Sequence, residues 1–273
     1  MNIKKCALIY SSLKKDESGP LINEIEKIIL EKNLELKLIK DFDLDNIEIQ
    51  KNLSEIDFLI VLGGNGLFLR SISKIIKEDT LVLGVDFGRK GFLAEVSPKE
   101  SIDFIKDILE GNYVIEKAMR LSIYLNNKKI GEALNEALLF SHTTGKLIEF
   151  KIDFNGNNLM QGFADGCIFS TPIGSTGYSC SAGGPIVDSH IKAIIITPIC
   201  PLSNLKPIVV SSSKILEIEI LNGEADIVID GHLRYNIKKE EKISIKESEY
   251  PINFVRRKIE KSFIKRIEKR LRY

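Results

Sequence analysis

One stretch decides the fold: Phe58-Leu59-Ile60-Val61-Leu62-Gly63-Gly64-Asn65-Gly66. Its apolar residues are typical of a buried strand, and the glycines that follow let the chain turn sharply into a helix predicted from Leu67 to Ile76. Such a turn exposes backbone N–H groups, and the start of the next helix adds a favourable dipole for an anion. The stretch therefore predicts either a phosphate-binding loop or a plain strand-to-helix turn.

Strand and helix patterns alternate on both sides of this stretch. Pro20 stands where a helix can begin. Alternation of strands and helices predicts a parallel sheet of the layered α/β type. The other strands are predicted at Cys6–Tyr10, Leu34–Ile39 and Leu81–Val85, and the other helices at Leu21–Lys32 and Pro98–Leu109.

The pattern changes near Gly111, after which short alternating or β-branched runs follow one another at about 8–12 residue spacing. Asn155-Gly156 is a strong hairpin turn, and Ala133–Ser141 reads as one strand. Many short strands predict an all-β domain of the β-sandwich type. We therefore expect a Rossmann-like α/β domain over residues 1–115, a β-sandwich over residues 116–254, and a basic C-terminal segment over residues 255–273.

Composition excludes several classes of protein. The 273 residues are 44% hydrophobic and 28% charged, which is a globular rather than a disordered composition. No apolar run approaches the roughly 20 residues that a membrane helix needs, and no secretory signal is expected at the N-terminus. The four cysteines form no CxxC pair, so we expect reduced thiols and a cytoplasmic protein.

Charge is unevenly distributed along the chain. The formal net charge is +1, but residues 255–273 hold nine basic and two acidic residues, whereas the rest holds 30 basic and 36 acidic residues. A basic tail can bind nucleic acid. An amphipathic helix that packs on the first domain is the favoured interpretation, and no nucleic-acid or membrane partner is expected. Its apolar stripe consists of Val255, Ile259, Phe263, Ile267 and Leu271.

Three further motifs carry polar chemistry. Gly84 to Leu93 is a second glycine-rich loop, at the same sheet edge as the first. Asp165 to Pro185 is dense in glycine and small hydroxyls, and about 20 residues without periodicity are uncommon in a compact domain unless they are functional. Asn135-Glu136 interrupts an apolar run, and an amide beside a carboxylate suits a sugar with vicinal hydroxyls. The alternatives are a connecting loop and a residue on the solvent face of a strand.

Together these motifs resemble the NAD kinase family, whose members phosphorylate the adenosine-ribose 2′-hydroxyl of NAD to give NADP. The resemblance implies an N-terminal α/β domain, a C-terminal β-sandwich, a final segment that returns to the first domain, and a homodimer or homotetramer. It rests chiefly on Asp165-Gly166 and on Thr171-Pro172-Ile173-Gly174-Ser175-Thr176-Gly177-Tyr178-Ser179-Cys180-Ser181-Ala182-Gly183-Gly184-Pro185, with Leu134-Asn135-Glu136 in support.

The resemblance also implies roles for individual residues. Asn135 and Glu136 would hold the adenosine ribose. ATP would be used with a divalent ion, Mg²⁺ or Mn²⁺, and positioning and charge neutralisation would do most of the work. No histidine shows metal-ligand spacing, so no metal-ligating residues are expected. The phosphates of ATP would lie against Gly63, Gly64, Gly66 and Arg70, and the rest of NAD against Asn65, Gly66, Lys146, Asp165, Thr176, Gly177, Tyr178, Ser179, Cys180, Ser181 and His232.

One residue departs seriously from the family pattern. The family motif Gly-Gly-Asp-Gly-Thr carries the proposed base at its aspartate, where this chain has Asn65, and Leu67 replaces the threonine. An amide cannot accept a proton at neutral pH, and general-base catalysis is typically worth ~10²–10⁴ in rate. Asp86 stands where the family usually has a neutral residue. A carboxylate moved to the second loop could therefore serve as the base, or Asp86 could cap a turn.

Three functions are compatible with these observations. The first is an ATP-dependent NAD kinase that Asn65 slows. The second is a catalytically impaired relative that binds NAD(H) or NADP(H) in a regulatory role. The third is a kinase of a lipid or sugar alcohol, against which the Ser/Thr/Gly loop and Asn135-Glu136 both argue.

Overall fold

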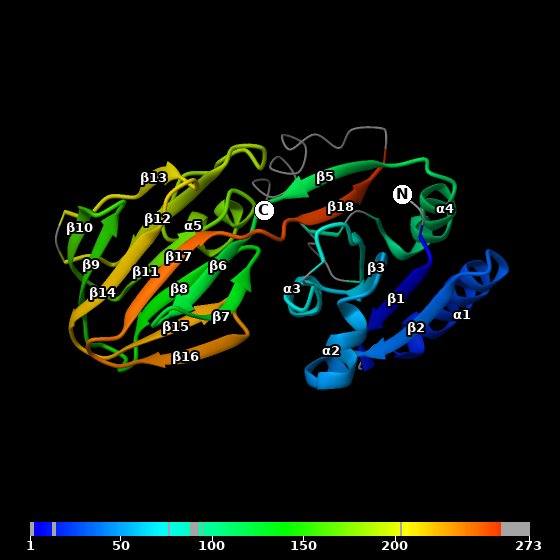
Figure 1. Ribbon diagram of the computed structural model, residues 1–273, viewed down its shortest axis with the longest axis horizontal. Helices are drawn as coiled ribbons and strands as arrows, with labels where there is room; N and C mark the ends of the chain where they lie inside the picture. Colours follow the sequence, from blue (N-terminus) through cyan, green and yellow to red (C-terminus); the bar gives the residue numbers. More distant parts are fainter. Residues whose placement is uncertain are drawn as a thin grey trace. The chain divides into compact units, whose positions relative to one another are not determined.

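The computed structural model describes residues 3–12, 15–75, 77–87, 93–94, 96–202 and 204–257 (Figure 1). These residues form two compact units. The first unit contains the described residues up to Lys117 together with those from Tyr250 to Arg257, and the second is Ala118–Glu249. Within the described part of the chain, no helix is long and apolar enough to cross a membrane.

The first unit is built on a six-stranded sheet in the order β2-β1-β3-β4-β18-β5. Strands β2, β1, β3, β4 and β18 each run parallel to their neighbours in that series, which confirms the predicted parallel α/β sheet. The elements are β1 (Lys5–Tyr10), α1 (Lys15–Glu31), β2 (Glu35–Lys40), the 3-10 helix η2 (Asp41–Asp45), α2 (Ile47–Leu53), β3 (Phe58–Gly63), α3 (Asn65–Ile72), β4 (Leu81–Asp86), α4 (Pro98–Leu109), β5 (Val114–Ala118) and β18 (Ile252–Arg256).

Two helices cover one face of this sheet. Ile25 and Ile29 of α1 and Phe104 of α4 join alternate residues of β1, β3 and β4 in one buried cluster. Helix α4 begins at Pro98 as predicted, and a capping box formed by Ser97 and Glu100 satisfies N–H groups at its start. Helix α1 begins earlier than the predicted Leu21, so Pro20 lies inside it. A proline there removes one backbone hydrogen bond but leaves the apolar face of the helix intact.

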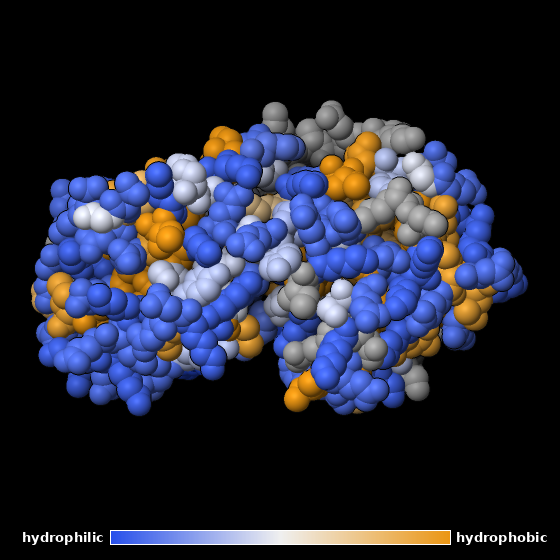
Figure 2. Space-filling view, viewed as in Figure 1, coloured by the Kyte–Doolittle hydropathy of each residue, from blue (hydrophilic) through white to orange (hydrophobic). Residues whose placement is uncertain are grey.

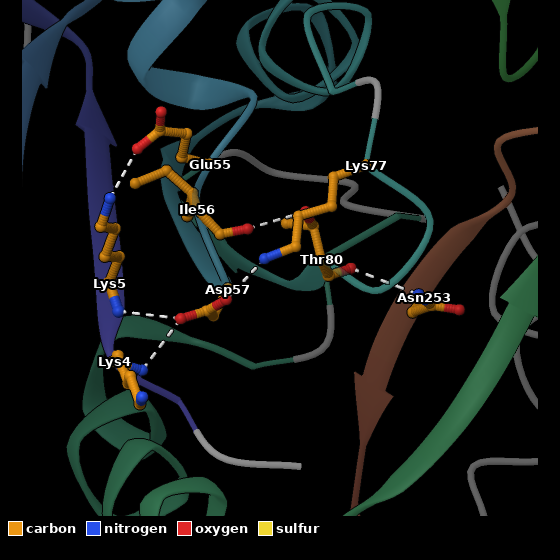
Figure 3. Close-up of polar contacts among 8 residues, drawn as sticks. All are labelled: Lys4, Lys5, Glu55, Ile56, Asp57, Lys77, Thr80 and Asn253. Atoms are coloured by element: carbon orange, nitrogen blue, oxygen red, sulfur yellow. Dashed lines mark hydrogen bonds and ion pairs between the residues drawn. The ribbon is translucent and has the colours of Figure 1, made fainter.

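Asp57 organises the edge of the first sheet at the N-terminal ends of its strands (Figure 3). Its carboxylate accepts the backbone N–H groups of Lys4 at 2.9 Å and Lys5 at 3.0 Å, and it binds Lys77 Nζ at 2.6 Å. Burial acts to raise the pKa of Asp57, but Lys77 and the two N–H groups hold it below its ordinary value. Asp57 is therefore a structural carboxylate that joins β1 to β3.

Strand β18 is held to the same edge by polar contacts (Figure 3). Asn253 Nδ2 donates to the backbone oxygens of Glu78 at 2.6 Å and Thr80 at 3.5 Å. Thr80 in turn is fixed by its hydroxyl, which donates to the Ile56 oxygen at 2.9 Å. Structural contacts occupy this edge. Open α/β sheets bind ligands at the opposite edge, beyond the carboxyl ends of the strands.

The second unit consists of two antiparallel six-stranded sheets, which confirms the predicted all-β domain. One sheet has the order β10-β9-β14-β17-β6-β7 and the other β13-β12-β11-β8-β15-β16. A single buried cluster contains residues of both sheets, such as Phe150 from the first and Phe169 from the second, so the sheets pack face to face. The strands are β6 (Leu121–Leu125), β7 (Lys128–Ala133), β8 (Glu136–Ser141), β9 (Ile148–Phe154), β10 (Asn157–Ala164), β11 (Gly166–Ser170), β12 (Ala193–Ile199), β13 (Ile208–Ser211), β14 (Leu216–Asn222), β15 (Ala225–Ile229), β16 (Leu233–Ile237) and β17 (Lys242–Glu247), and the short helices are η3 (Gly174–Thr176) and α5 (Tyr178–Ser181).

The predictions for individual turns, strands and helices after residue 117 had different outcomes. The Asn155-Gly156 turn is confirmed, since it joins β9 to β10 with φ of 52° and 77°. The single strand predicted over Ala133–Ser141 is wrong, because β7 ends at Ala133 and β8 begins at Glu136. The helix expected over residues 255–273 lies outside the described residues from position 258 onward, and its first two residues belong to β18.

Candidate functional site

The glycine turn after β3 leaves its backbone open. Gly64 caps α3, which begins at Asn65, and the Phe68 N–H donates to the Gly64 oxygen at 3.1 Å. A Cβ atom at Gly63 would lie 2.8 Å from the Leu67 side chain, whereas one at Gly64 or Gly66 would have nothing within 4 Å. Gly63 is therefore packed closely against Leu67, and the turn beyond it is free to approach a ligand.

This turn follows a strand at the topological switch point of the sheet. The chain passes from β1 to β2 on one side and then to β3 on the other side of β1. Asp86, the last residue of β4, is in register with Gly63, and its backbone N–H donates to the Val96 oxygen at 2.9 Å. The sheet thus brings the first glycine turn and Asp86 to one edge, as expected. Residues 88–92 of the second glycine loop lie outside the described residues.

Arg70 is engaged within the first unit. Its guanidinium binds Asp45 Oδ2 at 3.1 Å and the Asp41 oxygen at 3.4 Å. Lys74 binds the other oxygen of Asp45 at 3.2 Å, and the two cations lower the pKa of that carboxyl, Lys74 contributing most. One guanidinium nitrogen of Arg70 is thus held by Asp45 and Asp41, and the role of Arg70 as a phosphate ligand stays a prediction.

In the second unit, Asp230 holds the break between β7 and β8. Its carboxylate accepts the backbone N–H groups of Leu134 at 2.8 Å, Asn135 at 2.8 Å and Glu136 at 3.1 Å. Asp230 is only 7% exposed and has a φ of 45°, which places it in the left-handed region. These bonds explain why one apolar run becomes two strands, because residues 134–136 turn their N–H groups to a side chain instead of a neighbouring strand.

The long Ser/Thr/Gly loop is attached to the same break. The Thr171 hydroxyl donates to the Leu134 oxygen at 2.5 Å and accepts the Gly174 N–H at 3.0 Å. The Thr171 N–H donates to the Asn135 oxygen at 2.8 Å. A Cβ atom at Gly174 would lie 2.0 Å from that oxygen, so only glycine fits. The structure therefore brings together two motifs that the sequence analysis proposed separately.

Several hydroxyls of this loop maintain its shape. Ser175 Oγ donates to the Pro172 oxygen at 2.6 Å, and Ser179 Oγ lies 2.8 Å from Thr197 Oγ1. Thr176 Oγ1 donates to the Ile173 oxygen at 3.1 Å. These three residues are buried. Thr176 and Ser179, which we expected to lie around NAD, thus have internal hydroxyl contacts in the structure.

Other predicted residues of the loop region are accessible. Tyr178 is 41% exposed. Ser181 and Lys146 are also exposed, and Gly177, Cys180 and Asp165 are half-buried. The backbone N–H of Asp165 donates to the Ile199 oxygen at 3.0 Å. Among the described residues, no three His, Cys, Asp or Glu side chains gather as a metal site.

Two buried polar atoms beside Asp230 lack a hydrogen-bond partner among the described residues. They are Glu136 Oε2 and His232 Nε2. His232 faces the backbone oxygen of Asp230 through Nδ1 at 3.2 Å. Burial, together with the charge of Asp230, raises the pKa of Glu136 to about 8. Unpaired buried polar groups are costly unless a ligand satisfies them, so this turn has the properties of a binding site.

Sequence reasoning missed the residues that support this turn. Asp230-Gly231 is a turn signal after an apolar run, but nothing in the sequence indicates that it binds residues about one hundred positions earlier. Arg120 is 1% exposed, and its Nε lies 3.9 Å from Glu132 Oε2. Burial lowers the pKa of Arg120, against the opposing charges of Glu132 and Asp230. Arg120 is thus a buried cation close to the Asp230 carboxylate.

Comparison with known protein families identifies both units. Residues 21–113 match the family model for the ATP-NAD kinase N-terminal domain, and residues 134–257 match the one for the ATP-NAD kinase C-terminal domain. The NAD kinase of Methanosarcina acetivorans is 35% identical over 219 residues, which cover 79% of this chain and 78% of the relative. The NAD kinase of Natranaerobius thermophilus is 30% identical over 261 residues, or 91% of each chain.

Solved structures show the same architecture. An NAD kinase from Archaeoglobus fulgidus in complex with ATP superposes with a TM-score of 0.79 at 29% identity, over 98% of this chain and 99% of the other. Yeast NADH kinase complexed with NADH superposes with a TM-score of 0.86 over 100% of this chain and 89% of the other. At 24% identity, the yeast enzyme shows a shared fold.

Proposed function

This chain belongs to the ATP-NAD kinase family, and on that premise we propose that it transfers the γ-phosphoryl group of ATP to the 2′-hydroxyl of the adenosine ribose of NAD, giving NADP. The observation that carries this proposal is the turn at Asn135-Glu136. A buried carboxylate fixes its backbone, and Glu136 Oε2 and His232 Nε2 have no protein partner among the described residues. Such a turn offers an amide, a carboxyl group and an imidazole to a ribose.

The second unit would bind NAD. Asn135 and Glu136 would hold the adenosine ribose, since vicinal hydroxyls can satisfy an amide and a carboxyl group together. The exposed ring of Tyr178 offers a face for a base. His232 would contact NAD through its unpaired Nε2. The remaining contacts are assigned to Lys146, Asp165, Thr176, Gly177, Ser179, Cys180 and Ser181.

The first unit would bind ATP through the turn at Gly63, Gly64 and Gly66. Its open backbone and the start of α3 suit phosphate oxygens. A divalent ion, Mg²⁺ or Mn²⁺, would enter with ATP as part of the substrate, because Mg²⁺ is bound mainly through substrate phosphates. Asn65 would orient a hydroxyl by hydrogen bonding, but its amide cannot take a proton.

We also propose that the protein works in the cytoplasm as a homodimer or homotetramer. The family resemblance supports an oligomer, as do apolar side chains exposed on the second unit, among them Ile191, Leu202 and Val209. Figure 2 shows hydrophobic atoms gathered in patches on a largely hydrophilic face. Large contiguous apolar patches are typical of interaction surfaces. Light scattering of the purified protein measures the oligomer directly.

The activity is tested by incubating the purified chain with NAD, ATP and Mg²⁺ and measuring NADP. We expect NADP to form at a rate proportional to protein concentration, and a heat-denatured sample serves as the control. NAD binding measured by calorimetry without any NADP above that control would contradict the proposal. It would instead favour the impaired relative that binds NAD(H) or NADP(H).

A further inference from the structure

Phosphoryl transfer to a ribose hydroxyl releases a proton that some group must accept. Asn65, at the start of α3, cannot be that group, because an amide is not basic at neutral pH. Water can take the proton, but a positioned base is typically worth ~10²–10⁴ in rate. The carboxyl groups close to the proposed ribose site are therefore the candidates.

Glu136 has the geometry of such a base. It is the first residue of β8, and its backbone is fixed on both sides, since its N–H donates to Asp230 and its oxygen accepts the Asp230 N–H at 3.0 Å. Its Oε2 is buried and lacks a hydrogen-bond partner among the described residues. A Cβ atom at Gly177 would lie 3.5 Å from Oε2, so the long loop passes beside this oxygen without a side chain.

The other carboxylate of the turn has a different task. All three N–H groups of residues 134–136 donate to Asp230, which is therefore occupied by the backbone. Glu136 makes no comparable contact through Oε2. The two carboxyl groups thus have different roles. Asp230 positions the turn, and Glu136 is available to a substrate.

The charges around Glu136 suit proton transfer near neutral pH. Among the described residues, the Asp230 charge acts on Glu136, His232 lies against the Asp230 backbone oxygen, and Arg120 interacts electrostatically with Asp230. Burial and the Asp230 charge raise the pKa of Glu136 to about 8. A base is most effective when its pKa lies near the working pH, because it is then both basic enough and sufficiently ionised.

Asp86 is the competing candidate. It ends β4, where its backbone N–H donates to the Val96 oxygen at 2.9 Å. A base must lie within ~3.2 Å of the hydroxyl or reach it through one water. Glu136 lies on the turn that would hold the ribose, so a hydrogen bond from its carboxyl group to the sugar would also place it within reach of the hydroxyl proton.

We propose that Glu136 is the general base of the reaction and accepts the proton of the ribose 2′-hydroxyl on Oε2. This proposal rests on the proposed function. As the proton moves to the Glu136 carboxylate, the 2′-oxygen forms a bond to the γ-phosphorus of ATP. The bond from that phosphorus to the β–γ bridging oxygen breaks, and ADP leaves with the electron pair. The neutral Glu136 then returns its proton to water.

The experiment measures the single-turnover rate of NADP formation at saturating NAD and MgATP between pH 6 and pH 10, with NAD affinity measured separately by calorimetry. We expect the wild-type rate to rise with pH to a plateau through a midpoint near 8. Glu136→Gln should lower the rate by ~10²–10⁴ and abolish that rise, with a smaller effect on NAD affinity. Asp230→Asn should move the midpoint to lower pH, because it removes the neighbouring charge.

The matched control is Glu217→Gln, an exposed carboxyl group on β14, which should keep the wild-type rate and profile. A wild-type rate that does not change with pH, or wild-type turnover in Glu136→Gln, overturns the assignment while NADP formation stands. Loss of the pH-dependent rise in Asp86→Asn alone assigns the base to Asp86. If Glu136→Gln binds no NAD, its rate cannot test the assignment. A wild-type midpoint near 8 that moves to lower pH in Asp230→Asn then supports Glu136 as the base, and a midpoint that does not move contradicts it. A wild-type chain that makes no NADP refutes the proposed function itself.

Discussion

Glu136 shows how a single functional residue can reduce stability. A carboxyl group that is buried without a protein partner for one of its oxygens resists ionisation, whereas the unfolded chain ionises freely in water. The second unit is thus destabilised by the ionisation of the same residue that the proposed reaction uses. Removing the ionisable group should therefore stabilise the fold even as it removes activity.

This cost has a definite pH window. The pKa of Glu136 is raised from 4.5 to about 8, so folding loses stability as pH rises between these values and is unaffected below 4.5. We expect Glu136→Gln to match wild type in urea unfolding at pH 4 and to be more stable by up to about 5 kcal/mol at pH 9. Glu217→Gln should show no such pH-dependent gain. An equal effect of Glu136→Gln at both pH values would contradict the assigned burial.

At the scale of elements, one glycine joins the two motifs of the candidate site. Gly174 opens η3 and lies directly against the Asn135 backbone oxygen. This contact lets the loop after β11 attach to the start of β8. Because a Cβ atom would come within 2.0 Å of that oxygen, the loop and the turn cannot keep their present positions with any other residue.

Gly174→Ala should therefore change both stability and binding. We expect the free energy of unfolding to fall by about 1–3 kcal/mol through overpacking, and NAD affinity to fall at least tenfold as Asn135 shifts. Urea denaturation and calorimetry measure the two effects. Gly19→Ala is the comparison, because a Cβ atom there meets nothing within 4 Å and alanine suits helix α1. Unchanged NAD affinity in Gly174→Ala would refute the link between loop and turn.

The elements also show what a sequence can predict. Strands β3 and β4, helix α4 and the Asn155-Gly156 turn depend on local apolar patterns and turn residues, and these were predicted correctly. The break between β7 and β8 depends on bonds from Asp230 to residues 94–96 positions away, which no local pattern encodes. The buried Arg120 was missed for the same reason.

In the candidate site, too, features that depend on local sequence were predicted, and features that depend on distant contacts were not. Its glycines and its Asn135-Glu136 step could be read as motifs, because small residues and paired polar groups are visible in the sequence. The hydrogen bonds that the Thr176 and Ser179 hydroxyls make within the second unit could not be predicted, because they depend on where the loop folds back. Likewise, the ion pair between Arg70 and Asp45 requires α3 and η2 to be placed first.

At the scale of the whole molecule, the first unit is discontinuous in sequence. Strand β18 lies between β4 and β5, so residues after position 249 complete a sheet begun at residue 5. The Phe254 ring stacks on Phe68 with centroids 5.7 Å apart, and Arg256 binds Glu116 at 2.7 Å. Without β18, strands β4 and β5 lose their shared neighbour.

A chain that ends at Glu249 should therefore lose the first unit selectively. We expect hydrogen exchange to show loss of protection in β4 and β5, while β8 and β11 stay protected because the second unit keeps all its strands. A chain that ends at Arg257 keeps β18 and is the control. Retained protection of β4 and β5 in the shorter chain would show that β18 is dispensable.

The position of β18 has a consequence for synthesis on the ribosome. Strands β1 to β5 leave the exit tunnel first, but the gap between β4 and β5 stays unfilled until the segment around residues 252–256 has also emerged. The second unit is contiguous and needs no later segment. The sheet of the first unit therefore cannot be completed until the whole second unit has emerged, so the part translated first has to wait for the part translated last.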